Sequence, residues 1–301
     1  MYLEAFSALG TEIGLFFFPE GELTWWGLDP QPPRLASLED VAAARPDAVL
    51  VLGRPDWMLA TVRRCLELGL RVGVEKPVGT DAAALQALSA SAGAQVMVAQ
   101  PHLLNDFWRF VPPDPGRLSH FRFRLINGSP QRYRDWGVPW VLKRGVAGGG
   151  VMRNLGVHGI SAFQKLTGQG VEVRSALLSS VLYGLEVEEY ASTQLTAGGA
   201  LGQVEVGYTL GSDQASEFEM TAHWQHLSLR DDGANVLILD RRRGEKRVVP
   251  CLPLPRRYEQ FAQSVLDALS GKPTLVHDLT AHAQAMQTID QVYRVAKWVN
   301  A

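Results

Sequence analysis

The chain has 301 residues, of which 20% are charged, and its formal net charge is −2. This near-neutral balance gives no electrostatic case for a nucleic acid or an anionic membrane as a partner. The two cysteines, Cys65 and Cys251, show no metal-ligand spacing, so we expect no metal site. No apolar run is long enough to span a bilayer, and no signal-peptide pattern opens the chain, which predicts a soluble cytoplasmic protein.

The first hundred residues alternate between strand-like and helix-like segments. Short aliphatic runs are typical of strands buried on both faces, and longer segments with apolar residues three or four apart are typical of helices. Short strand–helix–strand links imply right-handed βαβ units, so we predict an α/β domain with a parallel sheet over residues 1–100. The predicted elements are strands at 23–28, 48–52, 71–74 and 95–99 and helices at 57–68 and 81–93.

The pattern changes after residue 100, where prolines punctuate a transition. Apolar and polar residues then alternate at period two, which is typical of half-solvated strands. We therefore predict an α+β domain over residues 101–301 with an open, mostly antiparallel sheet. Its predicted strands lie at 121–125, 171–182, 190–196, 201–208, 217–229 and 236–240, and its predicted helices at 151–166, 256–270 and 279–298.

Two motifs carry residues suited to proton chemistry. Lys76 follows a buried strand, and Pro77 keeps it extended, so its side chain is expected at the carboxyl end of a parallel sheet, where ligands bind. Asn154 and His158 follow a turn of three glycines and lie four residues apart, hence on one helix face. A histidine exchanges protons near neutral pH, whereas an amide has none to give. The alternatives are a solvated lysine at a strand end and a histidine satisfied in a helix–sheet interface.

Together, Glu-Lys-Pro at residues 75–77 and Gly-Gly-Gly…Asn…Gly…His at 148–158 resemble the motifs of the Gfo/Idh/MocA family of NAD(P)-dependent sugar and polyol oxidoreductases. The resemblance implies a Rossmann-like first domain, with Lys76 as the catalytic acid/base. It implies that Asn154, in place of the family's aspartate, and His158 face the substrate. Members of the family pair through the open sheet, and the sequence offers no obvious helices to cover an apolar sheet face, so we expect a homodimer or homotetramer.

The resemblance also implies a set of cofactor-binding residues. Asp29 ends a predicted strand, where a carboxylate binds the adenosine ribose and favours NAD over NADP. The glycine fingerprint is only partly present, because Gly10 fits its second position while Ala8 replaces the first and Glu12 adds a carboxylate. The full predicted set is Gly10, Asp29, Pro55, Glu75, Lys76, Gln100 and Trp140.

These observations predict an NAD(P)-dependent oxidoreductase that moves hydride between nicotinamide and a secondary alcohol or ketone of a sugar, cyclitol or similar molecule. Two other functions stay open. The incomplete glycine loop and the Asn154 replacement favour a catalytically silent binding or regulatory protein of the same fold. NAD-assisted glycoside hydrolysis or elimination is the third possibility.

Overall fold

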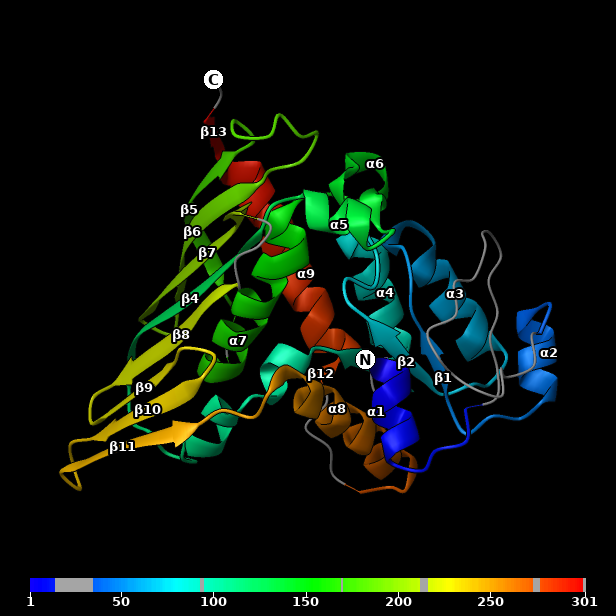
Figure 1. The fold of residues 1–301 in the computed structure, drawn as a ribbon, viewed down its shortest axis with the longest axis horizontal. Coiled ribbons are helices and arrows are strands. Elements are labelled where there is room, and N and C mark those ends of the chain that lie inside the picture. Colours follow the sequence, from blue (N-terminus) through cyan, green and yellow to red (C-terminus); the bar gives the residue numbers. More distant parts are fainter. Residues whose placement is uncertain (14–34, 93–94, 169, 212–215, 273–276, 300–301) are drawn as a thin grey trace.

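The structure, a computed structural model, describes residues 1–13, 35–92, 95–168, 170–211, 216–272 and 277–299. Two sheets lie on opposite sides of a central layer of helices (Figure 1). Three strands of the smaller sheet come from the first hundred residues and one from near the C-terminal end, and the larger sheet is built from residues after 117. Among the described residues, no helix has the length and apolar character needed to cross a membrane.

The smaller sheet has four strands in the order β1–β2–β3–β12. The first three strands are parallel, as the sequence predicted, and β12 pairs antiparallel with β3. Buried valines on β2 and β3 explain the apolar runs, because both faces of the sheet are covered. The C-terminal segment thus returns to complete the first sheet. The strands are β1 (Val49–Val51), β2 (Val72–Glu75), β3 (Val96–Ala99) and β12 (His277–Asp278).

Two helices follow these strands as their sequences predict. Helix α3 (Pro55–Glu67) begins with proline at its first position, where no backbone N–H is needed, and Gly69 with φ +76° follows its end. Helix α4 (Ala82–Ala92) begins after Asp81, whose Oδ1 accepts from the backbone N–H groups of Ala83 and Ala84 at 2.9 and 3.0 Å. Proline at the start of α3 and the Asp81 cap of α4 thus mark where the two helices begin.

The N-terminal segment differs from the strand–glycine loop–helix order of a dinucleotide fold. Residues 2–8 form helix α1 (Tyr2–Ala8), and Gly10 with φ +72° follows the end of that helix and no strand. The segment has the apolar face of a helix, because Tyr2 and Phe6 both pack against the buried cluster that contains Phe261. The strand predicted at 23–28 lies outside the described residues. A further short helix, α2 (Leu38–Ala43), is capped by Ser37.

The larger sheet has nine strands and is mostly antiparallel, as predicted, with parallel pairing only of β4 with β7 and of β5 with β13 among its described strands. In spatial order the strands are β11 (Glu245–Pro250), β10 (Asn235–Asp240), β9 (Leu227–Asp231), β8 (Glu217–Trp224), β4 (Leu118–Gly128), β7 (Ala200–Leu210), β6 (Tyr190–Ala197), β5 (Glu172–Ser179) and β13 (Lys297–Val299).

Helices cover the inner face of this sheet, which corrects the expectation that its apolar face is bare. On β4, Phe121 and Phe123 are buried, and the ring of Phe121 stacks on Phe163 of α7 (Val157–Thr167) at 5.7 Å between centroids. Helix α9 (Leu279–Val295) packs between α7 and the smaller sheet (Figure 1). The apolar surface is therefore buried within the chain, and the argument for a partner subunit from an uncovered face does not hold.

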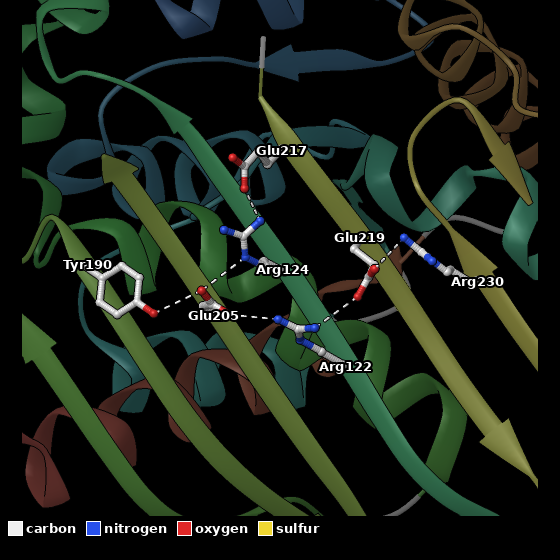
Figure 2. Close-up of polar contacts among 7 residues, drawn as sticks. All are labelled: Arg122, Arg124, Tyr190, Glu205, Glu217, Glu219 and Arg230. Atoms are coloured by element: carbon white, nitrogen blue, oxygen red, sulfur yellow. Dashed lines mark hydrogen bonds and ion pairs between the residues drawn. The ribbon is translucent and has the colours of Figure 1, made fainter. Parts of the chain in front are cut away.

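The outer face of the sheet carries charged side chains in a ladder across neighbouring strands (Figure 2). Glu205 on β7 lies at its centre and accepts from Arg122 at 3.2 Å, from Arg124 at 3.2 Å and from the Tyr190 hydroxyl at 3.1 Å. Burial acts to raise the pKa of Glu205, but these donors outweigh it and hold the pKa below its usual range. Cross-strand pairs of opposite charge thus replace apolar contacts on this face.

Three details of the second half differ from the sequence prediction. The strand predicted at 217–229 is a hairpin, β8 and β9, and α9 ends at Val295, after which β13 begins. Strand β11 was not predicted, because it lies at the edge of the sheet and its charged residues do not alternate with apolar ones.

The other helical segments are η2 (Pro101–Leu104), η3 (Asp106–Phe110), α5 (Gln131–Asp135), η4 (Pro139–Leu142), α6 (Arg144–Ala147), the π turn η5 (Met152–Gly156) and α8 (Leu254–Leu269).

Candidate active site

Lys76 lies directly after the carboxyl end of β2, as the sequence predicted. Its Nζ donates to the backbone oxygen of Asn154 at 2.5 Å and to Oδ1 of the same residue at 3.0 Å. Burial lowers the pKa of the Lys76 ammonium below its usual value, and the nearby Glu75 carboxylate opposes this effect. The structure therefore joins the two motifs that the sequence placed 78 residues apart.

The side chain of Asn154 is held from its other end by two tyrosines. Its Nδ2 donates to the Tyr208 hydroxyl at 2.8 Å and to the Tyr133 hydroxyl at 3.2 Å. Tyr208 on β7 is fully buried, and Tyr133 on α5 is 5% exposed. Burial raises the pKa of both phenols, so both stay protonated at neutral pH. These donors and acceptors fix the orientation of the amide, whose oxygen faces Lys76.

A buried carboxylate shapes the turn that leads into Asn154. Both oxygens of Glu188 accept from Gly150 N–H at 3.0 Å, and Oε1 also accepts from Met152 N–H at 3.0 Å and from the Tyr293 hydroxyl at 2.6 Å. Side chains at the glycines would collide with their surroundings, since a Cβ at Gly150 would meet the backbone of Glu188. Close packing of neighbouring backbone and side chains thus explains why the chain has glycine at these three positions.

Asn154 lies in the π turn η5, and His158 lies one turn later at the start of α7. π turns are rare and occur often at functional sites. The buried ring of His158 lies 4.4 Å from the ring of His102 between centroids. Burial, with smaller effects from Arg257 and Lys76, lowers the pKa of His102 to about 3, so this imidazole is neutral at pH 7. The two histidines and Lys76 therefore share one buried region.

Gln100 directly follows β3 and is 2% exposed. Its Nε2 lies 3.3 Å from the Ser161 hydroxyl and 3.2 Å from Nδ1 of His282, while Nε2 of His282 accepts from Val78 N–H. In a neutral imidazole whose Nε2 accepts, Nδ1 carries the proton, so the Gln100 amide fits better with its oxygen on that side. In either orientation one end of this buried amide has no hydrogen-bond partner among the described residues.

Glu75 is next to Lys76 and is met by the N-terminal helix. The Tyr2 hydroxyl donates to its Oε2, and the Tyr2 ring packs edge-on against Tyr258 at 4.7 Å between centroids. Burial raises the pKa of Glu75 to about 7, although Lys76 and the Tyr2 hydroxyl act in the opposite direction. Helix α1 thus covers a residue that the sequence predicted to bind the cofactor.

The other predicted site residues are spread over the same region and beyond it. Pro55 begins α3 after β1, at the same sheet edge as Glu75. Trp140 lies in η4 and is partly buried against the core. Gly10 lies at the end of α1, and Asp29 lies outside the described residues. Sequence reasoning missed Tyr133 and Tyr208 and left His102 without a role, because no local spacing links them to Lys76.

The site offers donors and acceptors that suit a nicotinamide-type ligand. The buried Nδ1 of His102 and one end of the Gln100 amide make no hydrogen bond to described residues, and Lys76 uses two of its three N–H groups. These groups fit a polar ring that carries a carboxamide. At the phosphate end, the described residues form no strand followed by a glycine loop.

Comparisons with known proteins concern the fold. Residues 114–224 match the family model described as the GFO/IDH/MocA C-terminal domain. No curated protein matches the chain by sequence.

Several solved structures share the fold. An oxidoreductase from Agrobacterium radiobacter, solved with NAD+, L-tartaric acid and magnesium, is 15% identical with a TM-score of 0.72, and the similarity covers 87% of this chain and 81% of that one. Levoglucosan dehydrogenase, solved with NADH and levoglucosan, shows the same identity, TM-score and coverage. A 3-ketoreductase from Actinomadura kijaniata, solved with NADP and TDP-benzene, is 18% identical with a TM-score of 0.63, covering 90% and 85%. At these identities the likeness establishes the fold.

Proposed function

We propose that the chain is a member of the Gfo/Idh/MocA family and an NAD(P)-dependent oxidoreductase, which the match of residues 114–224 to the C-terminal domain of that family and the shared fold support. The reaction moves hydride between the nicotinamide and a secondary alcohol or ketone of a sugar, cyclitol or similar molecule. The observation that carries this proposal is the partly buried ammonium of Lys76, held by Asn154 at the carboxyl end of a parallel strand.

Lys76 is the acid/base of the proposed reaction. An ammonium has three N–H groups, and two are used by the oxygens of Asn154, which leaves one for a substrate oxygen. The lowered pKa brings the group closer to neutral pH, where acid–base catalysis is most effective. In alcohol oxidation the neutral amine takes the hydroxyl proton as the C–H bond gives up its hydride, and in ketone reduction the ammonium returns the proton.

Asn154 is a positioning residue, because its amide has no proton to transfer. Its two tyrosine partners hold the amide oxygen on Lys76, so the lysine keeps one orientation in either protonation state. His158 is proposed to hold the substrate hydroxyl, since it lies on the helical segment that carries Asn154. The His102 ring beside His158 is neutral, so it adds no second positive charge near Lys76.

The cofactor supplies hydride acceptance and donation when it is bound. Gln100 and Glu75 are the described residues proposed to hold its nicotinamide half, with Pro55 and Trp140 lining the same region. The predicted ribose contact of Asp29 and the phosphate contact of Gly10 remain predictions. Solved structures of this fold that contain NAD+, NADH or NADP support a dinucleotide for this chain.

Calorimetric titration with NADH and NADPH tests the proposal. We expect both to bind, with NADH tighter because Asp29 disfavours the 2′-phosphate of NADPH. If neither cofactor gives heat at millimolar concentration, the dehydrogenase hypothesis is rejected and the catalytically silent binding protein is favoured. Tyr2 on Glu75 favours that second candidate, because it occupies a carboxylate predicted to contact the cofactor.

The substrate class is tested with a panel of sugars and cyclitols in the presence of NAD, followed by absorbance of NADH. Levoglucosan dehydrogenase and the 3-ketoreductase support a carbohydrate-like substrate. NAD that co-purifies and is regenerated in each turnover would instead support glycoside hydrolysis or elimination. A homodimer or homotetramer stays a prediction, to be checked by light scattering.

A further inference from the structure

A pocket of about 470 Å³ lies beside the glycine turn, and its lining does not include Lys76. It is formed by α6, the glycine turn, the C-terminal end of α9 and β13, which lie at the same end of the molecule (Figure 1). Its volume is in the range of pockets that hold small molecules. The lining residues are Arg144, Gly148, Gly149, Arg153, Glu188, Asp290, Tyr293, Arg294 and Trp298.

Arg153 forms a buried cationic floor in this pocket. The residue is 4% exposed, donates to the Thr80 carbonyl at 3.3 Å and pairs with Asp290 at 2.6 Å. Its Nε is buried and has no hydrogen-bond partner among the described residues. An unsatisfied N–H of a buried guanidinium costs free energy, so Arg153 has hydrogen-bonding capacity that the described residues do not meet.

Two more arginines lie at the mouth of the pocket. Arg144 donates through Nε and Nη2 to the carbonyl of Glu186 at 2.9 and 2.7 Å, while the carboxylate of Glu186 is paired with Lys143. Arg294 is exposed and makes no ion pair with any carboxylate in the described ranges. The guanidinium of Arg144 also lies 5.5 Å from the Trp298 ring centroid, which gives the rim an aromatic surface.

The two carboxylates of the pocket do not cancel this charge. Asp290 is engaged by Arg153, and Glu188 is engaged by the glycine turn and Tyr293. Burial raises the pKa of Glu188, although its hydrogen bonds oppose this. The lining therefore holds three guanidinium groups and two carboxylates, an excess of one positive charge, and among the described residues only Arg153 of the three arginines has an ion pair.

We propose that this pocket binds a small phosphate monoester, with its phosphate group on Arg144, Arg153 and Arg294 and its organic part against Trp298. Guanidinium groups match phosphate oxygens through paired, charge-assisted hydrogen bonds, and a dianion satisfies more than one of them. The pocket contains none of Lys76, Asn154 and His158, so the proposal does not depend on the dehydrogenase activity.

Calorimetric titration with phenyl phosphate at low salt tests the site, with benzoate as the carboxylate comparison. Arg144→Ala and Arg294→Ala should each weaken phenyl phosphate binding at least about tenfold, because each removes a charged hydrogen-bond donor. Both side chains are exposed, so the fold should be retained. Arg242→Ala, an exposed arginine in the turn between β10 and β11, is the matched control and should bind as the wild type does.

Each other outcome would overturn the proposal. No binding by the wild type at millimolar phenyl phosphate would show that the pocket is not an anion site. Binding that both arginine variants keep would place the ligand elsewhere, including at a dinucleotide site. Benzoate binding more tightly than phenyl phosphate would contradict the choice of a phosphate group.

Discussion

The Nζ of Lys76 lies 2.5 Å from the backbone oxygen of Asn154 and 3.0 Å from its side-chain oxygen. The same amide donates to Tyr208 and Tyr133, so one asparagine joins the parallel sheet to α5 and to the larger sheet. Because the amide of Asn154 carries no charge, it adds no ion pair to Lys76, and burial holds the pKa of Lys76 below its usual value against the opposing effect of Glu75.

Replacement of Lys76 by methionine should remove the proton-transfer step while leaving the fold intact. We expect turnover to fall by about two to four orders of magnitude, the usual contribution of a general acid or base. Affinity for NADH, measured by calorimetry, should change little. His158→Ala should cost less than Lys76→Met, since water and Asn154 can still hold a hydroxyl.

The matched control is Lys272→Met, an exposed lysine that pairs with Asp267 at the end of α8. It should keep the activity of the wild type. If Lys76→Met retains activity within a factor of a few, Lys76 is not the acid/base, even though the fold assignment would stand.

Replacement of Asn154 by aspartate should shift the pH profile of the reaction. A carboxylate in contact with the ammonium favours the charged form, so the pKa of Lys76 should rise from its lowered value. Alcohol oxidation needs the neutral amine, so the rise of kcat/KM with pH should move to higher pH. Asn235→Asp on β10, far from Lys76, should leave the profile unchanged. A profile of Asn154→Asp that coincides with the wild type would contradict the contact.

The pH dependence of stability should reveal Glu75. Its pKa is raised from 4.5 to about 7, so the folded state retains a proton that the unfolded state has lost. The associated stability is present below pH 4.5 and is lost as pH rises through about 7. Glu75→Gln abolishes this titration, so its free energy of unfolding relative to the wild type should increase between pH 5 and pH 8.

Urea denaturation at both pH values measures this difference. Glu172→Gln is the control, because its side chain is 67% exposed on β5, and it should show no comparable change. A constant difference between Glu75→Gln and the wild type at the two pH values would show that Glu75 ionises normally.

Removal of the Tyr208 hydroxyl should loosen Asn154. Tyr208→Phe deletes the 2.8 Å contact to Nδ2 in a fully buried position, which we expect to lower the free energy of unfolding by about 1 kcal/mol. Turnover should fall as well, because the amide then orients Lys76 less strictly. Tyr183→Phe, 39% exposed, is the control. Equal effects of the two substitutions on stability and turnover would rule out a special role for Tyr208.

Local patterns in the sequence predicted much of the fold. Aliphatic runs indicated the parallel strands, and Pro55, Gly69 and Asp81 marked where helices begin or end. Period-two alternation located most strands of the larger sheet. These features were predictable because propensity, capping and periodicity act between residues that are neighbours in the chain.

The same local character explains where the predictions stopped. Helix α1 packs its apolar face on α8, which lies more than 240 residues later, and the short strand β13 exists only because β5 is available to pair with it. Helices α7 and α9 cover the larger sheet, although nothing in the strand sequences shows what lies on either face. Contacts between distant segments depend on how the elements pack, and no local pattern encodes them.

For the candidate site, the sequence by itself determined the lysine at the strand end and the asparagine and histidine after the glycine turn. Only the tertiary structure decided that Lys76 contacts Asn154, and that Tyr133 and Tyr208 hold the amide from its other side. The physical reason is that these four side chains come from four elements, and a hydrogen bond between them forms only after burial of the apolar faces has brought those elements together.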